Sequence, residues 1–132
     1  MGPEFQDARL ITEDRAHPAT RGLPESWIHD EEWYSFRENP RAHGAHVLLR
    51  VDESTYSPVM HLPWYFWMFG RSRNLAMGED HPITWTRCAG RGRVFYTALG
   101  HQAASYRETE FLALLEGGIA WAARREGEGC EQ

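Results

Sequence analysis

The alternation of apolar and polar positions predicts several short strands in the first two thirds of the chain. Residues 6–12 (QDARLIT) have the pattern of a short strand. Residues 46–55 (HVLLRVDEST) contain the clearest buried strand, whose apolar run ends abruptly at Asp52 and Glu53. A strand that ends in two carboxylates places charge at one edge of the predicted sheet.

A hairpin and a helix follow in the last third. Residues 81–88 (HPITWTRC) and 93–100 (RVFYTALG) flank a glycine-bearing turn, which predicts a β-hairpin. Residues 105–125 have the periodicity of an amphipathic helix, and Ser105 and Glu108 have the spacing of a capping box, although a start one turn later is also compatible. The apolar stripe of this helix consists of Phe111, Leu114, Leu115, Gly118, Ile119 and Ala122.

Two aromatic segments fit neither pattern. Residues 29–36 (HDEEWYSF) are acidic and then aromatic, which suggests a short strand or a turn. Residues 58–69 (PVMHLPWYFWMF) contain two prolines, so we interpret them as a loop, a lid or a surface that packs on another chain. Several strands with one long helix predict an α/β layer that is incomplete in this chain.

Composition narrows the classes of partner. The chain has 132 residues and a net charge of −5, and all 14 of its basic residues are arginine. Without lysine it cannot form a Schiff base, and its arginines are scattered among 19 acids, so we expect no nucleic-acid partner. No apolar run reaches the roughly 18 residues of a membrane span, so we expect no membrane partner either.

The termini and cysteines suggest one domain in a reducing compartment. Residues 1–5 resemble an expression tag or a disordered start, residues 6–125 form the domain, and residues 126–132 are expected to be a disordered tail. Cys88 and Cys130 are too few for a disulfide framework, so we expect reduced thiols. The start also lacks the apolar core of a signal peptide, which favours a cytoplasmic location.

Three polar clusters lie at the ends of predicted strands, where ligands bind in α/β sheets. They are Asp52 with Glu53, His81 and His101. A carboxylate and two imidazoles suit acid–base chemistry or a divalent metal such as zinc. Asp52 and Glu53 are equally compatible with an ordinary turn, and His81 with a structural hydrogen bond. Gly100 allows a tight turn before His101, which favours a functional role for this histidine.

Six segments in this order resemble the ThuA-like (trehalose utilisation) family: residues 17–24, 30–36, 46–56, 77–87, 90–101 and 111–123. The resemblance implies a class I glutamine amidotransferase-like (flavodoxin-like) α/β fold, of which the chain is similar to the C-terminal part. His101 resembles the histidine that follows a late strand in that fold. The region of the nucleophile elbow has no counterpart here, so glutamine amidotransferase activity is not expected.

The resemblance implies a role in the metabolism of trehalose, other disaccharides or keto-sugars. In this hypothesis His101 and His81 act as acid–base or metal-binding groups, and Glu53 or Asp52 orients one of them. The sugar-sized pocket would be lined by Trp85, Tyr34 and Tyr56. The alternative is a non-catalytic binding or assembly module. Such a module would complete its fold as a homo-oligomer or with a partner chain, with residues 58–69 as the interface. A third possibility is that the chain is a fragment whose N-terminal half is missing.

Overall fold

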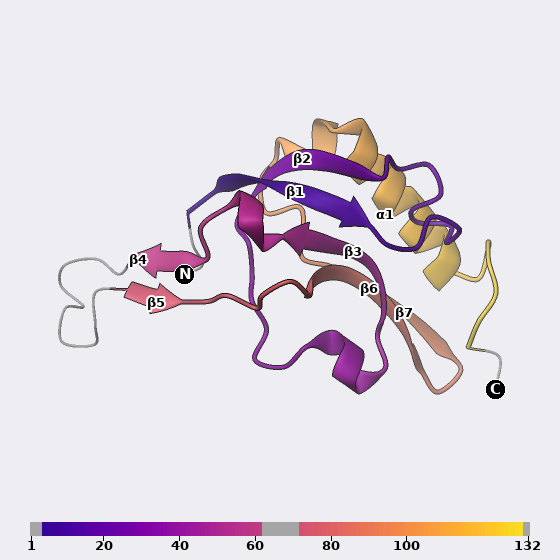
Figure 1. Cartoon of the computed structure of the whole chain (residues 1–132). Helices are drawn as coiled ribbons and strands as arrows, with labels where there is room; N and C mark the ends of the chain where they lie inside the picture. Colours follow the sequence, from indigo (N-terminus) through magenta and orange to yellow (C-terminus); the bar gives the residue numbers. More distant parts are fainter. Residues whose placement is uncertain (1–3, 62–71, 131–132) are drawn as a thin grey trace.

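A curled antiparallel sheet with one long helix forms the body of the protein, as the computed structural model in Figure 1 shows; it describes residues 4–61 and 72–130. Five strands pair in the order β2-β1-β3-β6-β7. Their bounds are β1 Gln6–Thr12, β2 Ser26–Glu31, β3 His46–Asp52, β6 His81–Ala89 and β7 Gly92–Thr97. The other elements are η1 Pro40–His43, η2 Glu53–Thr55, the paired β4 Val59–His61 and β5 Ser72–Asn74, η4 Ser105–Arg107 and α1 Thr109–Ala122.

The structure confirms the expected α/β class and the hairpin β6–β7. It also confirms the strands predicted at residues 6–12 and within residues 46–55, which are β1 and β3. The strands are antiparallel throughout, however, so the carboxyl ends of successive strands do not share one edge. The carboxyl end of β3 lies instead beside the amino end of β6, with Val51 opposite His81. The polar residues after β3 and at the start of β6 therefore meet because the strands run in opposite directions.

The core lies between the sheet and α1. The helix contributes Phe111, Leu114, Gly118 and Trp121 as its buried residues. A Cβ atom on Gly118 would lie 2.5 Å from Cζ of Phe95, so this glycine lets the helix approach β7 closely. Because side chains alternate along a strand, Val94 and Tyr96 point to the opposite face, where both are exposed.

Ile119 is wrongly placed in the predicted apolar stripe, and of the two possible starts of the helix the later one is confirmed. Ile119 was expected in the buried stripe but is 63% exposed. Trp121, which was not expected there, is buried instead. Ser105 and Glu108 form no capping box, since α1 begins only at Thr109 and its N-cap residue, Glu108, makes no side-chain cap. The Glu108 carboxylate contacts His29 of β2 instead. A tertiary ion pair thus replaces the local interaction that the spacing suggested.

Cys88 and Cys130 form a disulfide, which corrects the expectation of two reduced thiols. Cys88 lies on β6, and the segment that carries Cys130 turns beyond the end of α1 towards the side of the β6–β7 hairpin (Figure 1). Arg93 donates to the carbonyl oxygens of Glu126, Gly127 and Gly129, and its guanidinium lies 5.1 Å from the ring centroid of Trp121. These contacts and the disulfide bind residues 126–130 to the hairpin and the helix.

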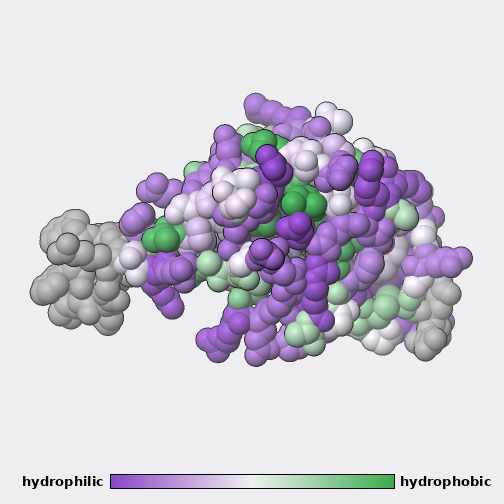
Figure 2. All heavy atoms as spheres, viewed as in Figure 1, coloured by the Kyte–Doolittle hydropathy of each residue, from purple (hydrophilic) through white to green (hydrophobic). Residues whose placement is uncertain are grey.

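The surface seen in Figure 2 is predominantly hydrophilic, with hydrophobic residues in small separate groups. Within the described residues, no helix is both long and apolar enough to cross a membrane. Of the aromatic segment 58–69, residues 59–61 form β4, which pairs with β5. Residues 62–69 of that segment lie outside the described residues.

Candidate functional site

His101 lies in the turn that follows β7, and Gly100 shapes this turn. The φ angle of Gly100 is +100°, in the region that favours glycine. A Cβ atom at this position would also lie 2.7 Å from Cζ of Phe111 in α1. Both the backbone angle and the close approach of the helix therefore require glycine before His101.

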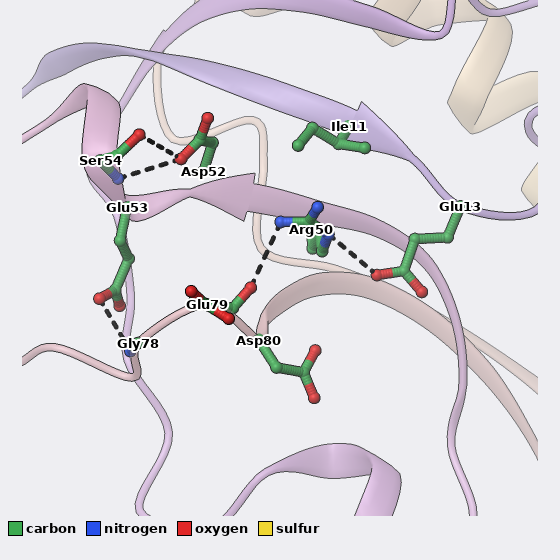
Figure 3. Close-up of a pocket in the computed structure, with 9 residues that line it drawn as sticks. All are labelled: Ile11, Glu13, Arg50, Asp52, Glu53, Ser54, Gly78, Glu79 and Asp80. Carbon is green, nitrogen blue, oxygen red and sulfur yellow. Dashed lines mark hydrogen bonds and ion pairs between the residues drawn. The ribbon is translucent and has the colours of Figure 1, made fainter.

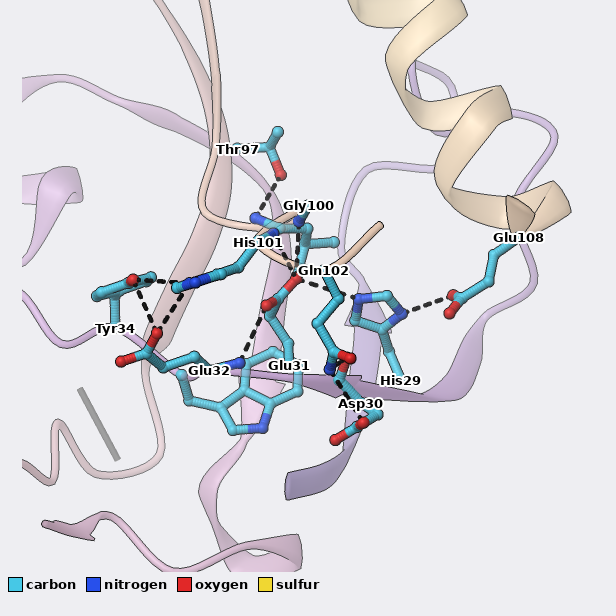
Figure 4. A network of polar contacts seen from close by, with 12 residues as sticks. His29, Asp30, Glu31, Glu32, Tyr34, Thr97, Gly100, His101, Gln102 and Glu108 are labelled. Atoms are coloured by element: carbon cyan, nitrogen blue, oxygen red, sulfur yellow. Dashed lines mark hydrogen bonds and ion pairs between the residues drawn. The ribbon is translucent and has the colours of Figure 1, made fainter. Parts of the chain in front are cut away.

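The imidazole of His101 is half exposed and is held at one nitrogen. Nδ1 lies 2.8 Å from Oε2 of Glu32 and 3.1 Å from the hydroxyl of Tyr34 (Figure 4). The Tyr34 hydroxyl donates to the same Glu32 oxygen at 3.0 Å. Nε2 has no hydrogen-bond partner among residues 4–61 and 72–130. We call His101 and Glu32 the dyad.

The surroundings of the dyad are aromatic and acidic. The ring of Tyr34 is parallel to that of His101, with centroids 6.5 Å apart, and Phe5 meets the imidazole edge-on at 5.2 Å. Partial burial and the neighbouring Glu32 carboxylate raise the pKa of Tyr34, so its hydroxyl stays protonated and can donate. Within the described residues, Nε2 of His101 is unbonded, and the rings of Tyr34 and Phe5 lie beside this imidazole.

A buried carboxylate, Glu31, lies beneath the dyad. Its Oε2 accepts from the backbone N–H groups of Gly100 at 2.7 Å and His101 at 3.3 Å, and its Oε1 accepts from that of Glu32 at 3.0 Å. Burial alone would raise the pKa of Glu31, but these hydrogen bonds and the nearby His29 outweigh it and lower the pKa. Glu31 is thus a stable carboxylate inside the protein.

His29 joins this carboxylate to the helix. Its Nδ1 lies 2.7 Å from Oε2 of Glu108, and its Nε2 lies 3.6 Å from Oε2 of Glu31. The second distance is longer than a hydrogen bond, so the two groups interact through charge. Burial would lower the pKa of His29, yet the two carboxylates raise it, which favours the imidazolium between them.

His81 and Glu53 form a second, buried pair on the other side of Tyr34. Nδ1 of His81 lies 2.7 Å from Oε1 of Glu53, and Nε2 donates to the backbone carbonyl of Tyr34 at 2.9 Å. The Tyr56 hydroxyl lies 3.2 Å from Nδ1, and burial, followed by the Glu53 charge, raises the pKa of this tyrosine. His81 is fully buried, so its geometry is that of a structural hydrogen-bonding residue.

Asp52 and Trp85 face other environments. Asp52 is the N-cap residue of η2, and its carboxylate accepts from the backbone N–H and the hydroxyl of Ser54. These hydrogen bonds lower the pKa of Asp52. It lines an open hollow of about 720 Å³, whose side chains in Figure 3 are mostly acidic around Arg50. Trp85 stacks on Tyr96 with ring centroids 4.1 Å apart. Neither residue contacts the dyad.

The structure therefore joins five of the seven candidate residues through Tyr34. The backbone carbonyl of Tyr34 binds His81, and its hydroxyl binds His101. The two histidines thus contact different atoms of Tyr34. The described part of the chain contains no group of three or more metal-binding side chains arranged to hold an ion. The five connected candidates are Tyr34, Glu53, Tyr56, His81 and His101.

Sequence reasoning missed two acids, Glu31 at the end of β2 and Glu32 directly after it. Glu31 and Glu32 follow one another, so their side chains point to opposite sides. The side chain of Glu31 is fully buried, and that of Glu32 is 12% exposed. The signal for them is the run HDEE at residues 29–32, where a histidine and three acids occur together before an aromatic pair. The pattern shows charge, but it does not show that these residues meet the turn after β7.

Comparison with known proteins gives one consistent family. A family model for ThuA, described as trehalose utilisation, matches residues 1–122. No significant match was found among curated proteins. Two crystal structures of ThuA-like proteins have the same fold over nearly all of this chain. The protein from Bacteroides uniformis superimposes with a TM-score of 0.70 at 23% identity, over 97% of this chain and 47% of that one.

The second structure is from Parabacteroides merdae. Its TM-score is 0.59 at 23% identity, over 98% of this chain and 42% of that one. The chain thus spans less than half the length of both structural neighbours. At this level of identity the comparison shows the fold, and the function has to be argued from the site.

Proposed function

Because the chain belongs to the ThuA (trehalose utilisation) family, we propose that it binds a disaccharide or keto-sugar beside His101 and transfers a proton through Nε2 of this residue. The observation that supports this function is the dyad. Glu32 holds Nδ1 of His101, whereas Nε2 has no partner within the described ranges. A neutral imidazole that donates from Nδ1 presents a basic lone pair at Nε2.

The surface beside the dyad suits a sugar. Tyr34 and Phe5 are 39% and 44% exposed and offer aromatic faces to the apolar side of a sugar ring. The Glu32 carboxylate and the Tyr34 hydroxyl can exchange hydrogen bonds with sugar hydroxyl groups. In a keto-sugar, Nε2 would remove the proton from the carbon next to the carbonyl group, and in a disaccharide it would bind a hydroxyl proton.

The buried pair supports the same surface from below. His81 is fully buried, and Glu53 lines the hollow shown in Figure 3 and not the surface beside the dyad. His81 holds the carbonyl of Tyr34 and so fixes the residue whose hydroxyl contacts the dyad. We assign them a supporting role in the proposed site.

Calorimetric titration with trehalose and with a 3-keto-disaccharide tests the proposal. We expect His101→Ala to weaken binding of at least one sugar about tenfold, the effect of losing one hydrogen bond to a charged or strongly polar partner. The matched control is His43→Ala, since His43 is also exposed and pairs with a carboxylate, Glu38, at 2.5 Å. Equal binding by His101→Ala and the wild type would refute the proposed site.

A second readout tests proton transfer itself. In deuterated water, the wild type should accelerate deuterium uptake next to the carbonyl of the 3-keto-disaccharide, and His101→Ala should abolish this acceleration. Uptake that continues at the wild-type rate in His101→Ala would show that another group moves the proton.

A further inference from the structure

Glu31 connects two parts of the dyad that belong to different edges of the sheet. Glu32 follows β2 and His101 follows β7, and these strands lie at opposite ends of the five-stranded order. The curl of the sheet brings the two segments together, and the Glu31 side chain lies between them (Figure 4). No strand pairing joins them directly, so their spacing is set by side chains. Gln102 donates to Asp30 at the exposed side, and Glu31 joins the two segments in the interior.

The two oxygens of Glu31 divide between these segments. Oε1 accepts the backbone N–H of Glu32, and Oε2 accepts the backbone N–H groups of Gly100 and His101. One rigid carboxylate thus holds the main chain of both members of the dyad. Since Glu31 is 0% exposed, it cannot touch a ligand and can act only through the residues that it holds.

We propose that Glu31 is a positioning residue, whose buried carboxylate sets the distance between Glu32 and His101 and thereby directs Nε2 of His101 towards the ligand. This role rests on the proposed function for its biological meaning, but its geometry can be tested without any sugar. The position requires two acceptor oxygens, because backbone N–H donors approach from both sides. Glutamine offers one acceptor oxygen and one NH₂ group, so in Glu31→Gln a donor would face a donor.

The test is the tautomer of His101, read from its ring nitrogen chemical shifts in ¹⁵N-histidine-labelled protein. In the wild type we expect the Nδ1–H form, because Nδ1 donates to Glu32. Glu31→Gln should lower the ratio of the Nδ1–H to the Nε2–H form about tenfold, the change expected from loss of one charge-assisted hydrogen bond. Glu32→Ala supplies the spectrum of a histidine without its orienting carboxylate.

Glu108→Gln is the matched control. It replaces another carboxylate next to His29 by the same isosteric amide, but Glu108 has no contact with Glu32, Gly100 or His101 among the described interactions. A wild-type tautomer ratio in Glu108→Gln and an altered ratio in Glu31→Gln would support the positioning role. If Glu31→Gln lowers stability but keeps the wild-type ratio, Glu31 is merely structural and the proposal is wrong.

Two further measurements complete the test. The double variant Glu31→Gln/Glu32→Ala should have the same ratio as Glu32→Ala alone, since Glu31 acts through Glu32; additive changes would contradict this. In the wild type, acid titration should shift the amide resonances of Glu32, Gly100 and His101 together as the Glu31 carboxylate is protonated. Independent transitions would overturn the proposal even if Glu31→Gln does not fold. Failure of sugar binding alone would refute the proposed function and leave these results intact.

Discussion

At the scale of single residues, the same side chain type has different roles in this protein because burial differs. His81 is fully buried with both ring nitrogens occupied. The His101 side chain is 49% exposed, and residues 4–61 and 72–130 occupy one of its ring nitrogens. A buried imidazole with two partners holds structure, and an exposed one with an oriented ring can exchange protons with a ligand. Of the two candidate histidines, only His101 therefore has the geometry of a reacting group.

We expect the protein to lose much of its stability when Glu53, the acid that pairs with the buried His81, is truncated. Glu53 is 10% exposed and accepts from the backbone N–H groups of Met77 and Gly78 at 2.5 and 2.8 Å, besides its contact with His81. We expect Glu53→Ala to lower the free energy of unfolding by about 3 kcal/mol, because it leaves a buried imidazole and two donors without their acceptor. Urea denaturation measures this change.

A suitable control for this variant is Glu79→Ala, which removes an exposed carboxylate next to Met77 and Gly78, the residues that donate to Glu53. It should change the free energy of unfolding by no more than about 0.5 kcal/mol. A similar loss in both variants would show that Glu53 contributes through its general location and not through the pair with His81.

At the scale of elements, a charged contact joins β2 to the start of α1. Glu108 is the N-cap residue of the helix, and its side chain reaches His29 instead of its own backbone. His29 in turn lies between Glu108 and Glu31, so the helix and the strand share one imidazolium. The docking of α1 is therefore coupled to the protonation of one residue on β2.

This contact predicts a pH dependence of stability. The pKa of His29 is raised in the folded protein, so the contribution of His29 is fully present below its unfolded value of about 6.5 and is lost as the pH rises through the folded value. The difference in free energy of unfolding between the wild type and His29→Gln should accordingly decrease with pH above about 6.5. Urea denaturation at a series of pH values measures it.

His17 provides the opposite case within the same chain. Burial lowers the pKa of His17, so the folded state binds fewer protons than the unfolded chain over the range between the two values. The difference between the wild type and His17→Gln should therefore increase with pH. Equal slopes for the two histidine variants would contradict the assigned directions.

At the scale of the whole molecule, a covalent link closes the hairpin against the C-terminal segment. The disulfide joins Cys88 to Cys130 across a sequence separation of 42 residues, and the enclosed chain includes β7 and α1. Such a link reduces the freedom of the unfolded chain and so stabilises the folded state.

Reduction of the disulfide should lower the free energy of unfolding by about 2–4 kcal/mol. Thermal or urea denaturation with and without dithiothreitol measures this loss. The double variant Cys88→Ser/Cys130→Ser should have the stability of the reduced protein and no response to dithiothreitol. A wild type whose stability is unaffected by the reductant would show that the bond does not contribute.

Local patterns explain how much of the fold could be predicted. Strand β1, strand β3, the hairpin and the helix follow from periodicity and turn residues, because these depend on neighbours in sequence. The antiparallel arrangement and the capping of α1 did not follow. Both depend on contacts between distant segments, as the replacement of the Ser105–Glu108 capping box by a contact with His29 illustrates.

The candidate site was predicted in part for the same reason. His101 could be identified because glycine before it, an apolar strand and the family resemblance all occur within one short segment. Its partner Glu32 lies 69 residues earlier in the chain, in a run of acids. The pattern cannot tell the fully buried Glu31 from Glu32, whose side chain is 12% exposed. Contact between charged side chains depends on where the segments meet in space.

The sequence by itself determined the family, the α/β class, the main elements and the histidine at the centre of the proposed site. The tertiary structure decided which acid holds that histidine, which histidine is buried and which cysteines are joined. The physical reason is that strand and helix formation depend on local periodicity, whereas the curl of the sheet brings the ends of β2 and β7 together. Only at that meeting point can one buried carboxylate, Glu31, hold both Glu32 and His101.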